Sequence, residues 1–547
     1  MADAAQRAGE PQTPHGKRPS LLRNGTSLIG IAIALAALVA ILFLVLAEML
    51  GPATSPYMGI LTYIVFPTIL VIGLLVMFIG AQRERRRRHR LQLSGEVPYP
   101  RIDLNSASTR RQLYTFSALS VIFLTISAVG SYHAFEYTES IEFCGQVCHE
   151  VMNPEFVAYQ SSPHARVRCV DCHVGPGAGW YVRSKLSGAY QVYAATFNLY
   201  PKPIPTPVAN LRPAQHTCEQ CHWPAKFFGA QLKEFNRFGY DEANTPRHTR
   251  MLIKTGGGSA EGGQVQGIHW HMNIANEISY VSTDDQRQRI PWVRMKSKDG
   301  KVEEYFLQGM PDKLGDLAKR PLRTMDCIDC HNRPSHIYNP PDLSVDKALF
   351  AGRIDKSLPF VKRQSVMLLA AAYPSTDAAL RAIAGGFNSF YQKNHPDVFA
   401  SQRPAIQRSI AELQKIYATN FFPEMKTDFR THPNNAGHYY NQGCFRCHDG
   451  KHVSKSGKVI SAECNICHET LDQQEGPKQV AITAGSYEHP LDFFGGLSNH
   501  ACTDCHTGQG ATFPRFKHTE GVDVAGMECI DCHAPAAAPD TAATAMR

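Results

Sequence analysis

The sequence predicts three N-terminal transmembrane helices followed by a mainly α-helical and loop domain with few short strands. Three uncharged apolar runs near the start of the 547-residue chain predict the helices. The 16 cysteines all fall into eight close pairs, and histidine follows each pair at once. The last four pairs occupy residues 444–533, a segment too short to bury a conventional apolar core.

Each cysteine pair has the spacing of a covalent haem site. Two thiols add to the two vinyl groups of one haem, and the adjacent imidazole then lies beneath the iron. A lone Cys-x-x-Cys is also typical of a zinc site or a thioredoxin-like redox pair, but eight repeats ending in histidine favour haem c. Seven motifs are regular: Cys169/Cys172-His173, Cys218/Cys221-His222, Cys327/Cys330-His331, Cys444/Cys447-His448, Cys464/Cys467-His468, Cys502/Cys505-His506 and Cys529/Cys532-His533. The first, Cys144/Cys148-His149, has one extra residue between its cysteines.

The motifs therefore predict a multihaem cytochrome c that carries eight covalently bound haem c groups. With every thiol committed to a thioether, no disulfide is expected. The porphyrins themselves are expected to form the core of the haem-rich segments. Because haem attachment of this kind occurs outside the cytoplasm, the chain from about residue 140 onward is expected in the periplasm.

The N-terminal apolar runs are long enough to span a bilayer. Residues 28–47 and 58–80 carry no charge, and residues 116–134 form a third, weaker candidate. A removable signal peptide is the alternative for the first run, which is longer than a typical apolar region of that kind. The predicted parts are a cytoplasmic tail (1–23), two helices (24–80), a basic cytoplasmic loop (81–113) and a third helix (114–135).

A block of arginines predicts the orientation. Residues 81–113 hold nine arginines and three acidic groups, and residues 1–23 hold four basic and two acidic groups, so their net charges of +6 and +2 equal the formal charge of +8 of the whole chain. Basic segments are retained on the cytoplasmic side, which places the N-terminus inside a bacterial inner membrane. The block is better explained by topology and contact with anionic lipid than by nucleic acid, and no nucleic-acid partner is expected.

The remainder divides into haem-rich and haem-free segments. We expect a tetrahaem domain (136–340) with a loop-rich insertion (223–326), a helical spacer (341–430), a C-terminal tetrahaem cluster (431–533) and a disordered tail (534–547). In the spacer, apolar residues recur at three and four positions and predict an amphipathic helix: Ile406, Ile410, Leu413 and Ile416.

Histidines outside the motifs are candidates for the second axial position of each iron. Those near a motif are favoured, because ligands come from segments packed on the porphyrin: His164, His336, His438, His452, His500 and His518. For four others, ligation and a surface role stay equally open: His216, His269, His271 and His489. His395 and His432 are expected at the surface. Met152 follows the first motif closely, and sulfur ligation and ordinary packing are both open for it.

Four parts of the sequence resemble the NapC/NirT family of membrane-anchored quinol dehydrogenases. They are the third apolar run, the Cys144 motif, Ser162-Pro163-His164 with the Cys169 motif, and the segment from Lys185 to the Cys218 motif. The resemblance implies Met152 as axial ligand of the first haem, His164 as a distal ligand of another, and Lys185 as a polar group of a quinol site. Arg183 and Gln191 are further candidates there, and Gln191 stands near where that family has an acidic residue. Three spans and a second haem cluster are similar to the larger inner-membrane cytochromes of this type in metal-respiring bacteria.

The resemblance implies that the chain oxidises menaquinol or a similar quinol from the membrane quinone pool. Electrons would pass through eight haems to soluble periplasmic c-type cytochromes in anaerobic or extracellular (metal) respiration. A membrane-anchored terminal reductase for nitrite, hydroxylamine or a sulfur oxyanion is the rival enzyme, although no motif replaces histidine by lysine. A non-catalytic periplasmic electron wire is the third reading. The first two helices leave room for a partner subunit or a second copy of the chain.

Overall fold

The structure is a computed structural model whose described residues form two compact units. It describes residues 21–50, 65–91, 104–147, 149–175, 177–208, 211–224, 227, 229–257, 267–272, 276–297, 299–309 and 315–480. One unit comprises Met1–Thr138 and Val174–Ala189, and the other comprises Glu139–His173 and Tyr190–Arg547. The last two haem motifs and the predicted tail lie outside the described residues.

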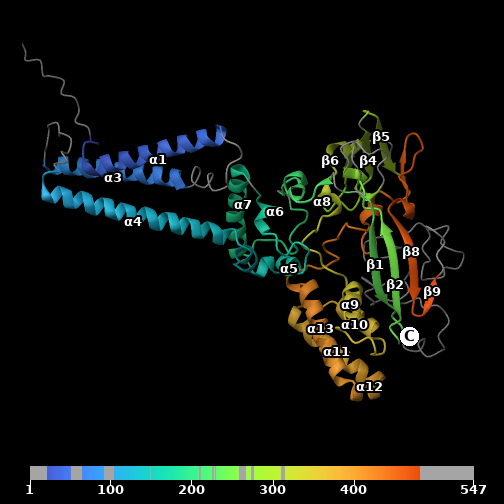
Figure 1. The fold of residues 1–547 in the computed structure, drawn as a ribbon. Helices are drawn as coiled ribbons and strands as arrows, with labels where there is room; N and C mark the ends of the chain where they lie inside the picture. Colours follow the sequence, from blue (N-terminus) through green and yellow to red (C-terminus); the bar gives the residue numbers. More distant parts are fainter. Residues whose placement is uncertain are drawn as a thin grey trace, which may run out of the picture. The chain divides into compact units, whose positions relative to one another are not determined.

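Long apolar helices build the first unit. Helices α1 (Gly25–Leu50), α3 (Phe66–Leu91) and α4 (Ala107–Thr138) follow one another along the chain (Figure 1). Among the described residues, the segments Gly25–Val45 and Phe66–Leu91 are long and apolar enough to cross a membrane. Helix α3 continues through the arginine block rather than ending before it, because arginine is a good helix former and its charges can leave the bilayer at the helix end.

Small residues let α1 and α3 pack closely. A Cβ atom on Gly30 would lie 2.3 Å from the backbone nitrogen of Met77, and one on Gly73 would lie 2.6 Å from that of Ala34. The Ser27 hydroxyl also donates to the Met77 carbonyl at 3.1 Å. Membrane helices lack a hydrophobic driving force for association, so this close backbone contact is what holds such a hairpin together.

The second unit contains two antiparallel sheets with the strand orders β1-β2-β8-β9 and β6-β3-β4-β5-β7 (Figure 1). The strands are β1 (Gln231–Phe238), β2 (Pro246–Ile253), β3 (Asn276–Val281), β4 (Trp292–Ser297), β5 (Val302–Leu307), β6 (Arg323–Thr324), β7 (His452–Ser454), β8 (His468–Glu475) and β9 (Lys478–Val480). Pairing of β2 with β8 and of β5 with β7 combines the predicted insertion with the C-terminal segment. The expectation of few short strands therefore understated the sheets, because partners so far apart in sequence give no local pairing signal.

The helical spacer forms an apolar core of its own. It consists of α9 (Pro341–Phe350), α10 (Val361–Ala370), α11 (Thr376–Asn394), α12 (Pro396–Ser401) and α13 (Arg403–Asn420). The predicted amphipathic helix is confirmed as α13, whose four periodic apolar residues are all buried. Their partners include Ile383 and Phe387 of α11. This segment is thus held by conventional side-chain packing, whatever the haem groups contribute elsewhere.

Shorter helical elements connect these parts. The α-helices are α5 (His149–Gln160), α6 (Cys169–His173), α7 (Ala178–Thr196) and α8 (Cys327–Cys330). Single turns are η2 (Phe143–Val147), η3 (Ala214–His216), η4 (Cys218–Gln220), η6 (Ile268–Met272), η7 (Gly315–Lys319), η8 (Pro423–Met425), η9 (Gly443–Arg446) and η10 (Cys464–Ile466). Most of these turns carry a haem motif or a candidate ligand, so the short helical turns are concentrated at the candidate haem sites.

His432 is buried, which corrects the expectation that it lies at the surface. Only 3% of the residue is exposed, and its Nδ1 lies 3.1 Å from the Thr206 hydroxyl. Burial and the charge of Arg333 lower the pKa of His432 to about 4, although Glu155 and Asp428 oppose the shift.

This burial predicts a pH-dependent loss of stability. The unfolded chain takes up a proton at His432 near pH 6.5, whereas the folded chain takes it up only near pH 4. The neutral ring therefore makes its full contribution to the free energy of unfolding above about pH 6.5. This contribution, on the order of 3 kcal/mol, is lost as the pH falls toward 4. Thermal unfolding between pH 4 and 7 should show a shallower decline in His432→Gln than in the wild type. Equal declines would contradict the assignment.

Candidate functional site

Each described motif forms about one helical turn. The backbone nitrogens of His222, His331 and His448 donate to the carbonyl of the first cysteine of their motif at 2.8, 2.8 and 3.0 Å. Residues four apart on a helical turn share one face, so the histidine lies below the first thiol of its pair. This turn would let the two cysteines hold one edge of the porphyrin while the histidine of the same motif binds its iron.

The irregular first motif has a different turn. Residues Phe143–Val147 form a π-helical turn, which takes up the extra residue between the cysteines. Gly145 lies inside this turn, where a Cβ atom would be 2.2 Å from Cδ2 of Phe156. Cys148 lies outside the described residues, and the side chain of His149 is not described.

Five motif histidines each lie beside a second imidazole. The ring centroids are 6.3 Å apart for His173 and His336, 6.1 Å for His222 and His164, 6.3 Å for His331 and His269, 5.7 Å for His448 and His271, and 6.1 Å for His468 and His438. Two metal–imidazole bonds of about 2 Å, with roughly 1 Å from each nitrogen to its ring centre, give about 6 Å for two imidazoles on opposite faces of one metal ion. The spacing fits an iron between each pair.

The Nδ1 atoms of four of the five second imidazoles are already engaged. His336 can donate to the Glu155 carbonyl at 2.9 Å, His164 to that of Pro334 at 3.2 Å, His269 to that of Thr255 at 2.5 Å and His271 to that of Ile268 at 2.7 Å. A hydrogen bond at Nδ1 fixes the tautomer and leaves the lone pair on Nε2 for a metal. Burial also lowers the pKa of His336 and His271, which favours the neutral form that ligation requires.

A buried ion pair positions His336. Arg333 donates to both carboxylate oxygens of Glu155 at 3.0 and 3.2 Å, and its Nε donates to the His336 carbonyl at 2.6 Å. Burial alone would raise the pKa of Glu155, but the charge and hydrogen bond of Arg333 lower it overall. Glu155 lies on α5, three residues after Met152. One short helix therefore carries the carboxylate that positions the ligand candidate His336 and also Met152, a ligand candidate for a different haem.

Thiols of successive motifs lie close together. The Cys144 and Cys169 sulfur atoms lie within hydrogen-bonding distance of each other. Cys218 and Cys327 are neighbours of the same kind. Weaker electrostatic interactions link the thiols of the other successive motifs: Cys172 with Cys221, Cys330 with Cys444 and Cys447, and Cys444 with Cys467. The six described attachment sites therefore follow one another in space in their sequence order.

The structure brings together some of the favoured ligand candidates and not others. His164, His336 and His438 face motif histidines, as do His269 and His271, for which the sequence left the choice open. The two latter residues flank Trp270 in the turn η6, and the short His-Trp-His sequence just after a glycine-rich segment was the available signal.

The other candidates have different surroundings. His452 is buried with Nδ1 2.8 Å from Asp449 and Nε2 2.7 Å from the Ile290 carbonyl, so both ring nitrogens are occupied. His216 is exposed, and His395 packs against Phe360 and Tyr391. His489, His500 and His518 lie outside the described residues, as do Cys502, Cys505, His506, Cys529, Cys532 and His533.

Residues suggested for a quinol site lie on α7. The Lys185 amino group is 3.5 Å from the Thr138 hydroxyl, at the last residue of α4, and lies 4.9 Å from the centre of the Tyr181 ring. Arg183 instead lies over Trp180 at 5.6 Å. Residues two apart on a helix point about 200° apart, so Arg183 and Lys185 face different sides of α7. The Gln191 side chain is exposed.

These features together define a membrane-anchored c-type cytochrome. The model of the NapC/NirT cytochrome c family, N-terminal region, matches residues 106–203, which include α4, the first two motifs and α7. The chain belongs to this NapC/NirT cytochrome c family. More particularly, it is similar to the cytochrome c-type protein ImcH of Geobacter sulfurreducens, with 45% identity over 491 residues that cover 90% of this chain and 96% of that protein. No solved structure matches the chain.

Membership establishes the general chemistry. The protein is an electron-transfer oxidoreductase that carries covalently bound haem c, and its apolar N-terminal helices indicate anchoring in the inner membrane. Haem c supplies one-electron chemistry when it is bound. The paired imidazoles with engaged Nδ1 atoms fit this cofactor.

Proposed function

We propose that the protein is an inner-membrane quinol dehydrogenase that oxidises menaquinol or a similar quinol and passes electrons through eight c-type haems to soluble periplasmic cytochromes. One observation carries the proposal: the Lys185 amino group is held beside Thr138, where α4 ends. If α4 is the third span, this places a cation at the membrane surface, where a quinol headgroup arrives. The N-terminus would then lie in the cytoplasm and the haem domain in the periplasm.

Lys185 has a definite role in this proposal. Quinol oxidation releases two protons and two electrons, and negative charge develops on a quinol oxygen as the proton leaves. The Lys185 ammonium would donate a hydrogen bond to that oxygen and stabilise the charge. Arg183 and Gln191 are proposed as further polar groups of the site, and Met152 as the axial ligand of the first haem.

We further propose that the five imidazole pairs are the axial ligand sets of five haems. These pairs are His173/His336, His222/His164, His331/His269, His448/His271 and His468/His438. An iron held on both faces has no open position for an oxyanion substrate. This argues against a terminal reductase at these five sites, and the remaining reductase reading would require a site among the others.

The test uses the full-length, haem-loaded protein in lipid, with haem stoichiometry measured on the same sample. Anaerobic stopped-flow absorbance after mixing with a menaquinol analogue should show fast reduction of several haems. Lys185→Ala should slow this reduction, whereas Lys233→Ala, at an exposed position of β1, should leave it unchanged. Reduction by a soluble donor but not by quinol would defeat the proposal and favour the electron wire.

A further inference from the structure

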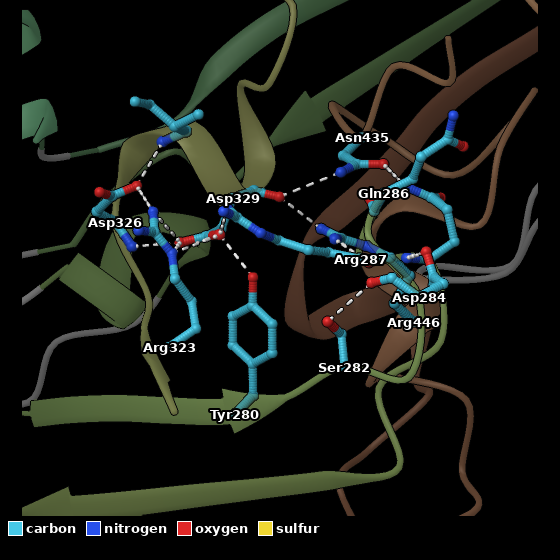
Figure 2. A network of polar contacts seen from close by, with 12 residues as sticks. Tyr280, Ser282, Asp284, Gln286, Arg287, Arg323, Asp326, Asp329, Asn435 and Arg446 are labelled. Carbon is cyan, nitrogen blue, oxygen red and sulfur yellow. Dashed lines mark hydrogen bonds and ion pairs between the residues drawn. The ribbon is translucent and has the colours of Figure 1, made fainter. Parts of the chain in front are cut away.

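Two successive haem motifs are joined through the residues between their cysteines. Asp329 lies between Cys327 and Cys330, and Arg446 lies between Cys444 and Cys447. The Arg446 Nη2 donates to the Asp329 carbonyl at 2.6 Å (Figure 2). Asp329 is 2% exposed and Arg446 is 8% exposed. Residues between haem cysteines need not be buried, so their burial here indicates a specific role.

The Asp329 carboxylate is the centre of the junction. Its Oδ1 accepts from the Tyr280 hydroxyl at 2.6 Å and from Arg287 at 3.0 Å. Arg323 donates to both carboxylate oxygens at 3.1–3.2 Å, and the Asp326 backbone nitrogen donates to Oδ2 at 2.7 Å (Figure 2). Strand β3, strand β6, the loop after β3 and the start of α8 are therefore all fixed to one side chain in the Cys327 motif.

Arg446 anchors the other motif to the same junction. Besides its bond to Asp329, it donates from Nη1 to the Arg287 carbonyl at 2.9 Å and from Nε to the Gly443 carbonyl at 2.8 Å. Asn435 adds a hydrogen bond to the Asp329 carbonyl at 3.3 Å. The planar guanidinium spans three backbone carbonyls, which a lysine could not do.

The turn η6 connects the same two motifs a second time. His269 faces His331 of the Cys327 motif, and His271 faces His448 of the Cys444 motif. Two ligand candidates two residues apart thus reach two different haem sites. The relative placement of the two sites is therefore fixed on the cysteine side by Asp329 and Arg446, and on the side of the second imidazoles by η6.

We propose that Asp329 and Arg446 are positioning residues that fix the haem sites at Cys327 and Cys444 against each other and set their midpoint potentials. The inference rests on the proposed haem sites at these two motifs. The junction lies between the last motif of the N-terminal group and the first of the C-terminal group, where electrons cross from one group to the other. Its buried charges act in a low dielectric, so they influence the potential of both sites.

The test combines potentiometry with internal electron transfer in the full-length, haem-loaded protein. Asp329→Asn removes a buried negative charge, so the midpoint potentials of the two sites should rise. Arg446→Lys keeps the positive charge but loses the planar guanidinium that binds the three carbonyls, so the two sites are held less firmly. Electron redistribution after flash photoreduction should therefore slow, with little change in midpoint potential. The matched control is Asp171→Asn, which changes the equivalent position of the Cys169 motif, where the aspartate is exposed, and should do neither.

An Asp329→Asn protein that matches Asp171→Asn in both measurements overturns the inference. If Asp329→Asn attaches fewer than eight haems, Tyr280→Phe takes its place: it removes only one hydrogen bond to the carboxylate, loosens the junction and, like Arg446→Lys, should slow redistribution. Unchanged redistribution in Tyr280→Phe with full haem content would also overturn it. Neither measurement uses quinol, so failure of quinol oxidation in the wild type would be seen separately.

Discussion

Replacing Asp346 by alanine is expected to lower the free energy of unfolding by about 3–5 kcal/mol, because it leaves a buried ammonium group without its counter-ion. The Lys362 amino group lies 3.0 Å from Asp346, and both side chains are 1% exposed. Lys362 also donates to the Phe238 carbonyl at 2.6 Å, while Asp346 accepts from the Phe238 nitrogen at 3.1 Å. The pair therefore joins the end of β1 to α9 and α10.

Chemical denaturation followed by far-ultraviolet circular dichroism would measure the loss. The control is Asp397→Ala at an exposed position of α12, which should change stability by no more than about 0.5 kcal/mol. The double variant Asp346→Leu/Lys362→Met removes both charges and should be more stable than Asp346→Ala alone. Equal stability of Asp346→Ala and Asp397→Ala would show that the pair contributes little.

Replacing His271 by alanine is expected to convert one haem from a low-spin to a high-spin form. The ring of His271 faces His448 at a centroid distance of 5.7 Å, and its Nδ1 is held by the Ile268 carbonyl at 2.7 Å. Loss of this imidazole leaves one axial ligand, and the weaker ligand field permits the high-spin state. Electron paramagnetic resonance of the oxidised protein should show one new high-spin iron per chain, with haem stoichiometry unchanged.

His452 provides the matched control for this experiment. It follows the same motif closely in sequence, yet Asp449 and the Ile290 carbonyl occupy its two ring nitrogens. His452→Gln should therefore leave the spin state of every haem unaltered, even where it lowers stability. A new high-spin iron in His452→Gln, or none in His271→Ala, would reverse the ligand assignment.

The attachment residues stay a prediction from sequence, and the sequence can make this prediction because the motif is local. Covalent haem attachment needs two cysteines and one histidine within five residues, so each regular motif carries its whole signal in one turn. The helix α13 was predictable for a similar reason, since its apolar residues recur at helical spacing within the eleven residues from Ile406 to Ile416. In both cases the information needed for the prediction lies within one element.

The imidazoles that lie beside the motif histidines were less predictable because they come from segments remote in sequence. Proximity to a motif favoured His452, whose nitrogens are occupied, over His269 and His271, which reach their partners through the folding of the insertion. Nothing local distinguishes an imidazole that donates to a neighbouring carboxylate from one that lies beside a motif histidine. The quinol-site residues were suggested by family resemblance, and the structure adds the contact of Lys185 with Thr138.

The pairing of β2 with β8 has a consequence for how the chain reaches its folded state. Arg247 lies opposite Glu475, and Tyr305 of β5 lies opposite Ser454 of β7. Neither sheet can be completed until the chain beyond the first five haem motifs is available to pair. Closing such long loops is entropically costly and slows folding. We therefore expect both sheets to form late in folding, which leaves the early cysteine pairs accessible while haem is attached.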